Sequence, residues 1–134
     1  MSRTYPATRS RQPRKQRRAH FNAAKHRVRK EVSAHLSGDL IDEWNVRSLP
    51  VNKGDTVRII RGSHKGHEAK VAGIDLGRRL ITVEDATIAK ADGTATPKWI
   101  HHSNVILTKL TLEDPRRREK LEQEVGNLWD SGKV

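Results

Sequence analysis

The sequence contains no cysteine and few aromatic residues, with three Trp, one Tyr and one Phe among 134 residues. The absence of cysteine excludes disulfide bonds, a thiolate nucleophile and a zinc site with cysteine ligands, and it suits the cytosol. No apolar run approaches the roughly 18 residues of a membrane span, and no segment has the apolar core of a signal peptide. We therefore expect a soluble cytoplasmic chain that is not secreted by a standard route.

Apolar residues are also scarce, because they make up 34% of the chain, below the roughly 45 to 50% of ordinary globular domains. A chain of 134 residues has room for one modest domain and an additional segment beside it. We therefore expect that some part of the chain cannot fold alone.

Acidic residues are missing from the first thirty positions, and Glu31 is the first of them. This segment holds eight arginines and three lysines, so the remaining residues carry 27 − 11 = 16 basic side chains against 16 acidic ones. The net charge of +11 therefore belongs wholly to residues 1–30. A like-charged block repels itself and buries too little apolar surface to fold alone. We predict an extended basic arm that stays disordered until a polyanion neutralises it, with nucleic acid as the leading partner.

Three other roles for the arm are weaker. A transit peptide is also rich in arginine and poor in acids, but Pro6 and Pro13 interrupt the amphipathic helix that it requires. Binding to anionic lipid needs an apolar face, and only Tyr5 and Phe21 offer bulky apolar groups near the charges. A merely solubilising tail is seldom so one-sided. No membrane partner is expected.

Hydrophobic periodicity divides the rest of the chain. Leu40, Ile41 and Trp44 recur at helical spacing, which predicts one short helix that ends at Asn45 and leads into an extended connector. The predicted parts are the basic arm over 1–30, the short helix and connector over 31–50, a barrel over 51–110, and a C-terminal helix and tail over 111–134.

Short strands are predicted between residues 55 and 110, where apolar and polar residues alternate. In the first strand Val57 and Ile59 fall on one face, with Thr56 and Arg58 on the other. Turns rich in glycine separate about five such runs, and Asp92-Gly93 is a signal for a two-residue hairpin. This spacing predicts a mainly β fold built on a small, partly closed SH3-like barrel.

A second helix is predicted from Pro115, which follows a capping aspartate. Leu121, Val125 and Leu128 give it one narrow apolar stripe, so we expect a peripheral helix that leans on the barrel or on a partner. Gly126 is expected to end or fray this helix.

Catalysis is tested most directly by RGSHKGHEAKVAGID, residues 61–75, because glycines are typical of nucleotide-binding loops. A Walker-type loop needs G-x-x-x-x-G-K-[ST] before a helix, whereas Gly66 is followed by His67 and a strand pattern. His64 and His67 have the spacing of metal ligands, but no cysteine or well-placed carboxylate completes a site. No activated group is arguable elsewhere. We predict no enzymatic activity, no metal, no cofactor and no small-molecule substrate.

A family resemblance is carried by the same region and its flanks. One segment resembles a KOW motif and has Gly66 at the position of the hallmark glycine; it reads KGDTVRIIRGSHKGHEAKVAGIDLGRRLITVE. The flanks of this segment resemble the large-subunit ribosomal protein twenty-four family, in its archaeal and eukaryotic branch (called twenty-six in eukaryotes). They read HFNAAKHRVRKEVSAHLSGDLIDEWNVRSLPVNKGD and ADGTATPKWIHHSNVILTKL. The resemblance runs from about His20 to Leu110 and favours an archaeal member. It departs from the family at Ala24 and His102, where proline is usual.

This resemblance implies a non-enzymatic, structural constituent of the large ribosomal subunit. It would bind large-subunit rRNA near the polypeptide exit tunnel and support subunit assembly and translation in the cytoplasm. Neighbouring large-subunit ribosomal proteins are implied partners, and the sequence leaves open whether nascent chains or targeting factors at the tunnel exit are others. The alternative is a KOW-type transcription elongation module that binds RNA polymerase and RNA, although such factors usually carry a separate α/β domain before the motif.

Contacts with rRNA are expected along the arm and on one turn of the barrel, because arginine forks hold phosphate oxygens and stack on unpaired bases. The predicted rRNA-binding residues of the arm are Arg3, Arg9, Arg11, Arg14, Lys15, Arg17, Arg18, His20, Lys25, His26, Arg27, Arg29 and Lys30. Those that follow the arm are Arg47, Ser48, Lys53, Arg61, Gly62, Ser63, His64, Lys65, Gly66 and His67.

Several of these residues have a second interpretation. Gly62 and Gly66 either supply a positive φ to a turn or allow close approach to RNA, and for Gly66 both apply. Phe21 either stacks on a base or packs against the short helix. Trp44 and Trp99 are more often core residues than stacking platforms.

Overall fold

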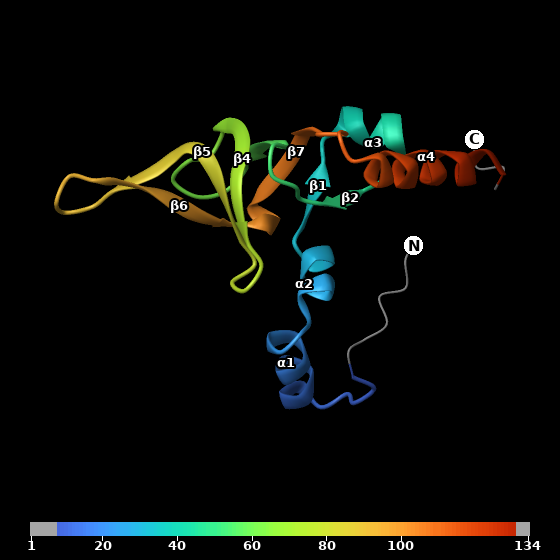
Figure 1. Ribbon diagram of the computed structural model, residues 1–134, viewed down its shortest axis with the longest axis horizontal. Coiled ribbons are helices and arrows are strands. Elements are labelled where there is room, and N and C mark those ends of the chain that lie inside the picture. Colours follow the sequence, from blue (N-terminus) through green and yellow to red (C-terminus); the bar gives the residue numbers. More distant parts are fainter. Residues whose placement is uncertain (1–7, 131–134) are drawn as a thin grey trace.

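A computed structural model describes the backbone of residues 8–130 and the side chains of residues 8–126. Within this range the chain forms a mainly β domain with a helical arm and further helices (Figure 1). The helices are α1 (Pro13–Phe21), α2 (Lys25–Glu31), α3 (Gly38–Trp44), the 3-10 helix η1 (His102–Asn104) and α4 (Pro115–Asp130). The strands are β1 (Ser33–Leu36), β2 (Ser48–Pro50), β3 (Thr56–Ile59), β4 (Glu68–Asp75), β5 (Leu80–Ala89), β6 (Ala95–His101) and β7 (Val105–Lys109).

The predicted strands are present as β3 to β7, which all lie between residues 55 and 110 as predicted. Alternation determines which face each side chain takes, because successive residues of a strand point to opposite sides. Val57 and Ile59 are accordingly buried, whereas Arg58 between them is exposed. The mainly β class with a small barrel-like domain is therefore confirmed.

Two further strands, β1 and β2, extend the sheet beyond the predicted ones. The strand order is β2-β1-β7-β3-β4-β5-β6, with all pairings antiparallel except that of β1 with β7. Only four residues long, β1 finds its partner about seventy positions later, where His35 pairs with Ile106. Pro50 lies in β2 at the edge of the sheet, which is where a residue without an N–H is tolerated.

The hairpin of β5 and β6 reaches away from the rest of the sheet (Figure 1). The predicted Asp92-Gly93 hairpin is present, but its loop has three residues, not two. Lys90 N–H donates to the Thr94 carbonyl at 2.8 Å, and the Gly93 N–H donates back to the Lys90 carbonyl at 3.0 Å. With φ of +89°, Gly93 forms the glycine bulge that usually accompanies a three-residue loop.

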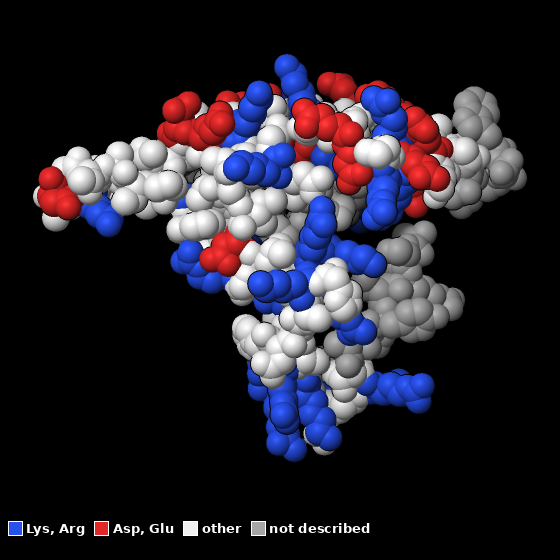
Figure 2. Space-filling model, in the orientation of Figure 1, with Lys and Arg blue, Asp and Glu red and all other residues white. Residues whose placement is uncertain are grey.

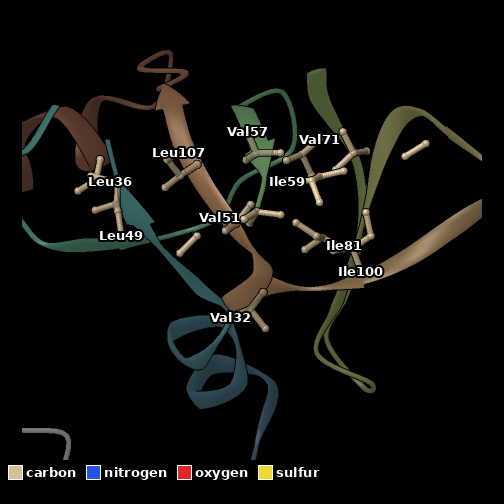
Figure 3. Close-up of a cluster of buried hydrophobic side chains, with 14 of the residues drawn as sticks. Val32, Leu36, Leu49, Val51, Val57, Ile59, Val71, Ile81, Ile100 and Leu107 are labelled. Atoms are coloured by element: carbon tan, nitrogen blue, oxygen red, sulfur yellow. The ribbon is translucent and has the colours of Figure 1, made fainter. Parts of the chain in front are cut away.

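A single apolar core joins the strands to two helices (Figure 3). Val57, Ile81 and Leu107 are fully buried at its centre. The end of the arm contributes Val28, and α4 contributes Leu121, which is 1% exposed. Burying one such side chain stabilises the fold by about 1.5 to 3 kcal/mol, so both helices are held to the barrel.

Both predicted helices of the folded part are present, as α3 and α4. Asn45 follows α3 with φ of 51°, in the left-handed conformation that commonly ends a helix. Gly126 does not end α4, which continues to Asp130, so the prediction that the helix ends there was wrong. The side chain of Leu128, predicted to belong to the apolar stripe, lies outside the described side chains.

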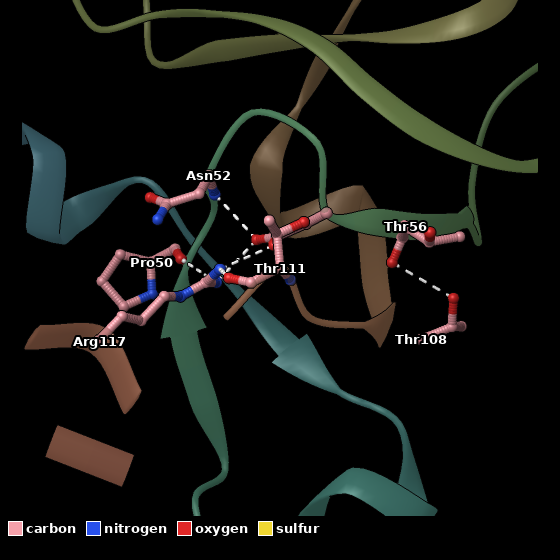
Figure 4. A network of polar contacts seen from close by, with 7 residues as sticks. Pro50, Asn52, Thr56, Thr108, Thr111 and Arg117 are labelled. Atoms are coloured by element: carbon pink, nitrogen blue, oxygen red, sulfur yellow. Dashed lines mark hydrogen bonds and ion pairs between the residues drawn. The ribbon is translucent and has the colours of Figure 1, made fainter. Parts of the chain in front are cut away.

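A buried ion pair ties α4 to the turn before β3 (Figure 4). Arg117 donates from both terminal nitrogens to the Asp55 carboxylate at 2.7 Å, and the Asp55 side chain is completely buried. The same carboxylate accepts the backbone N–H groups of Asn52 and Thr111. Every lone-pair direction of this buried carboxylate is thus used, as burial of a charge requires.

Candidate nucleic-acid interface

The arm contains two short helices, whereas an extended segment was expected. Pro13 stands at the first position of α1, where its missing N–H costs nothing and its fixed φ suits a helix. It therefore starts a helix that it was expected to interrupt. No side chain of α1 is buried, so this helix rests on its own backbone hydrogen bonds and not on packing against the barrel.

The predicted basic residues of the arm are exposed throughout. Of the eleven, Arg3 lies outside the described residues, which leaves 11 − 1 = 10. None of these ten forms an ion pair with an acid in the described part of the chain. On the face that Figure 2 shows, basic side chains cover α1 and α2 and no acid is visible among them, whereas acids lie mainly along the opposite edge. The arm is thus a concentrated, unneutralised positive charge.

One joint fixes the arm against the barrel. Arg79, in the turn between β4 and β5, donates to the Glu31 carboxylate at 2.8 Å and to the His20 carbonyl at 2.6 Å. His20 lies 3.6 Å from the same carboxylate. Arg79 holds a φ of 56°, which is strained for a residue with a side chain. The first acid of the sequence is therefore the attachment point of the arm.

His102 closes the other side of this joint. Its Nδ1 donates to the Ser33 carbonyl at 2.7 Å, since a carbonyl can only accept. Burial lowers the pKa of His102 below its ordinary 6.5, because charging the ring would strip it of water; the hydrogen bond to Ser33 opposes this shift. The neighbouring charges of His101 and Arg79 lower the pKa further.

The turn between β3 and β4 holds the second group of predicted residues. Gly62 and Gly66 have φ of +102° and +88°, values that other residues rarely adopt. The Gly66 N–H donates to the Ile59 carbonyl at 2.7 Å, so it closes the turn and is not available to RNA. Arg61, Ser63 and Lys65 are exposed, while His67 reaches back to the Glu84 carbonyl at 2.9 Å.

The structure brings the arm and this turn to the two sides of η1. Ile60, which precedes the turn, donates to the Asn104 carbonyl at 2.9 Å, and His102 contacts Ser33, the first residue of β1 after the arm. Arg47, Ser48 and Lys53 are exposed but belong elsewhere. Lys53 precedes β3 while the turn follows it, and Ser48 lies on β2, at the far edge of the sheet from the turn.

The structure decides the position of three aromatic residues, and only Trp99 differs from what the sequence favoured. Trp99 is 40% exposed, so its predicted core position was wrong; its neighbour Ile100 pairs with Ile81 on the core side of β6, which turns Trp99 outward. Phe21 is 72% exposed, so of its two interpretations packing against the short helix is excluded. Trp44 is partly buried against the core, as predicted.

Sequence reasoning missed the residues that complete the surface around the turn. Lys98 donates to the Ser63 hydroxyl across the gap between β6 and the turn. Arg78 lies over the Trp99 ring, with its Cζ 4.7 Å from the ring centre. The only available signal was the run of cationic and aromatic residues at 98–99, because their partners lie about 20 to 35 positions away.

Neither a metal site nor a membrane span is found in the described part of the chain. Among residues 8–126, no three His, Asp or Glu side chains gather as metal ligands would. No helix between residues 8 and 130 has the length and apolar character needed to cross a bilayer.

Fold and charge together define a small, mainly β protein with a basic helical arm. The family model that describes the ribosomal proteins called L26 in eukaryotes, together with their archaeal L24 counterparts, matches residues 10–124. The chain belongs to this family and is therefore a ribosomal protein, not an enzyme, located in the ribosome of the cytoplasm. Membership also argues against the transcription elongation module that the KOW motif left open.

Three archaeal relatives carry the name large ribosomal subunit protein uL24. The protein of Methanosphaera stadtmanae is 46% identical over 116 residues, which cover 87% of this chain and 99% of that protein. The protein of Methanothrix thermoacetophila is 47% identical over 110 residues, or 82% and 95%. That of Haloquadratum walsbyi is 46% identical over 114 residues, or 85% and 96%. The chain is thus of the archaeal uL24 type.

Proposed function

We propose that this protein is a structural constituent of the large ribosomal subunit that binds large-subunit rRNA through its arm and the turn over residues 61–67. The observation that carries this proposal is the set of ten exposed basic side chains on residues 9–30 without an acidic partner. Unpaired surface cations at this density release counterions when they meet phosphates, which drives binding to a polyanion. The predicted rRNA-binding residues of the sequence analysis are the proposed contacts, and neighbouring ribosomal proteins are the proposed further partners.

Helical structure strengthens the proposal for the arm. In α1, Arg17 and Arg18 follow Arg14 by three and four positions, so part of the charge gathers on one side of a short rod. RNA helices are contacted mainly through their backbones, and such a rod can follow a line of phosphates. The joint at Arg79 orients this rod before RNA is bound, which lowers the entropy lost on binding.

The salt dependence of RNA binding tests the arm. Binding to large-subunit rRNA should weaken with salt at a log-log slope of about −6 or steeper if about eight phosphates are contacted. The triple variant Arg14→Gln, Arg17→Gln, Arg18→Gln should make this slope shallower by about 2 to 3. Its matched control carries Arg116→Gln, Arg118→Gln, Lys120→Gln, which removes the same formal charge from exposed positions of α4. Equal slopes for the two variants would contradict a binding role of the arm.

Place in the subunit is tested with the whole ribosome. Tagged protein in a cell extract should sediment with the large subunit, and its absence from that fraction refutes the proposal. A position near the polypeptide exit tunnel and a supporting role in assembly are proposed from the family resemblance. Because the chain has no cysteine, a single cysteine at Asp92 or Glu122 gives a unique attachment point for a cross-linker. Cross-links to a stalled nascent chain from either position support the tunnel site. If neither position gives a cross-link, the proposed site is contradicted.

A further inference from the structure

The turn between β3 and β4 presents unused backbone donors. Within the described chain, the N–H groups of residues 61 to 64 donate to no acceptor, whereas those of Lys65, Gly66 and His67 close the turn. Arg61, Gly62 and Ser63 are exposed. A Cβ added to Gly62 would meet nothing within 4 Å, so the backbone faces open space there. Successive free N–H groups in a turn that includes a residue of positive φ form a concavity suited to an anion.

A hollow of about 160 Å³ opens directly beside these donors. Ile59 and Ile100, which are 1% and 6% exposed, provide apolar lining, and the Trp99 ring is part of the wall. Asn104 and His101 add polar groups; in the described chain the Asn104 side-chain amide has no intramolecular partner. The lining includes the cations Arg61 and Lys98 and no acid. A hollow that combines an apolar wall, several polar groups and a positive rim fits a flat, anionic ligand.

His101 is held with one donor free to serve the hollow. The Ser103 N–H donates to His101 Nδ1 at 3.2 Å, so in the neutral ring the proton resides on Nε2. Nothing in the described chain accepts from that Nε2. A base edge in the hollow would therefore meet a ring donor from His101 and both a donor and an acceptor from Asn104.

Trp99 is positioned as a stacking surface. Arg78 covers one part of the ring and is itself held by Asp75, whose carboxylate lies 2.8 Å from its Nε. Arg78 does not line the hollow although Trp99 does, so the guanidinium and the hollow meet different parts of the ring. The Trp99 indole lies on an edge strand with 40% of its surface exposed, so folding of the chain does not bury this apolar ring. Such an exposed ring favours stacking on a base.

We propose that this hollow binds one unpaired nucleotide of the RNA, with its base against Trp99 and its phosphate on the backbone N–H groups of residues 61–64. The nucleotide must be unpaired, because a base within a duplex is covered on both faces and cannot enter a slot. Arg61 and Lys98 at the rim neutralise the phosphate charge. The inference deepens the proposed function and rests on it, since it names a specific contact within the RNA interface.

The proposal is tested with mononucleotides and the full-length chain, by 15N NMR. Uridine and adenosine 5′-monophosphate should shift the Trp99 indole signal and the amide signals of residues 61–64, whereas ribose 5-phosphate should shift only the amides and bind at least about fivefold more weakly. If ribose 5-phosphate and the nucleotides bind equally, the site takes phosphate alone and the base pocket is refuted. No shift with any ligand refutes the whole site.

Two variants separate this site from a change in folding and from the arm. Trp99→Leu should weaken nucleotide binding about fivefold or more while leaving ribose 5-phosphate binding unchanged. Phe21→Leu, which removes an exposed aromatic ring of the arm that does not line the hollow, should change neither. An equal loss in both, or none in Trp99→Leu, overturns the proposal. The salt dependence of rRNA binding tests the arm, and nucleotide binding tests the hollow. Either result can therefore contradict its own proposal without affecting the other.

Discussion

At the scale of single residues, the strongest constraint on this fold is a charge that water cannot reach. Asp55 is fully buried and Arg117 is its ion-pair partner, 8% exposed. Surface ion pairs contribute little because water screens them, but here both groups have left water. The net stabilisation by the intact pair is therefore smaller than the free-energy cost of removing one partner and leaving the other charge buried.

Arg117→Met should lower the free energy of unfolding by about 3 to 5 kcal/mol, because the Asp55 carboxylate stays buried without its counter-ion. The double variant Asp55→Asn, Arg117→Met should recover part of this loss, since a neutral amide still offers an oxygen to the Thr111 N–H. Urea unfolding followed by tryptophan fluorescence measures both values. A loss below about 1 kcal/mol in the single variant would mean that the pair behaves as a surface contact.

His102 makes stability depend on pH around neutrality. Its pKa is lowered in the folded protein by burial, so the contribution of the neutral ring is complete above pH 6.5 and is lost as pH falls through the lowered pKa. Compared with His102→Asn, whose amide also donates to the Ser33 carbonyl, the natural protein should lose stability as the pH falls below 6.5, the ordinary pKa of histidine. Thermal unfolding at several pH values measures the difference. His26→Asn, at an exposed position of the arm, is the control; parallel curves for the natural chain and His102→Asn would exclude this role.

At the scale of elements, α4 shows a local signal overridden by its surroundings. Gly126 lies within the helix, has no positive φ, and would place an added Cβ in open space. Leu121 anchors the preceding turn in the core, so the helix continues although glycine disfavours it by roughly 0.5 to 1 kcal/mol. Tertiary contacts have decided against propensity here.

Gly126→Ala should therefore raise the stability of α4, by about 0.5 to 1 kcal/mol, because alanine removes flexibility that the unfolded chain gains from glycine. Circular dichroism and thermal unfolding measure the gain. If Gly126 instead capped the end of the helix in the left-handed conformation, the same substitution would destabilise the protein.

At the scale of the whole molecule, charge and core are divided between two parts of the chain. Residues 1–30 hold the net charge, and α1 buries no side chain. Val28 of α2 and the Glu31 that Arg79 binds belong to the joint with the barrel. Composition predicts that residues 1–30 do not fold on their own, and this stays a prediction. Because residues 25–31 make the contacts with the barrel, truncation on either side of them is the sharpest test.

A chain lacking residues 1–19 should unfold at nearly the same temperature as the full chain, because the described side chains of that part contribute nothing buried to the core and the His20 carbonyl that Arg79 binds is kept. A chain lacking residues 1–31 should be less stable by about 2 kcal/mol or more, since Val28 leaves the core and Arg79 loses its carboxylate partner. Calorimetry of the two truncated proteins gives the comparison. Equal destabilisation by both would place the stabilising contacts in α1.

Sequence by itself determined the segregation of charge and the alternating strands β3 to β7, because both depend on the order of neighbouring residues. It also indicated the basic turn at residues 61–67 and the family, since motif and flanks are contiguous. Tertiary structure alone decided the pairing of β1 with β7, the Arg79 joint and the turning of Trp99 toward the hollow. Each of these depends on residues about 20 to 70 positions apart, which local patterns cannot bring together. Packing selects such contacts, because a buried polar group must find a partner and apolar side chains must be removed from water.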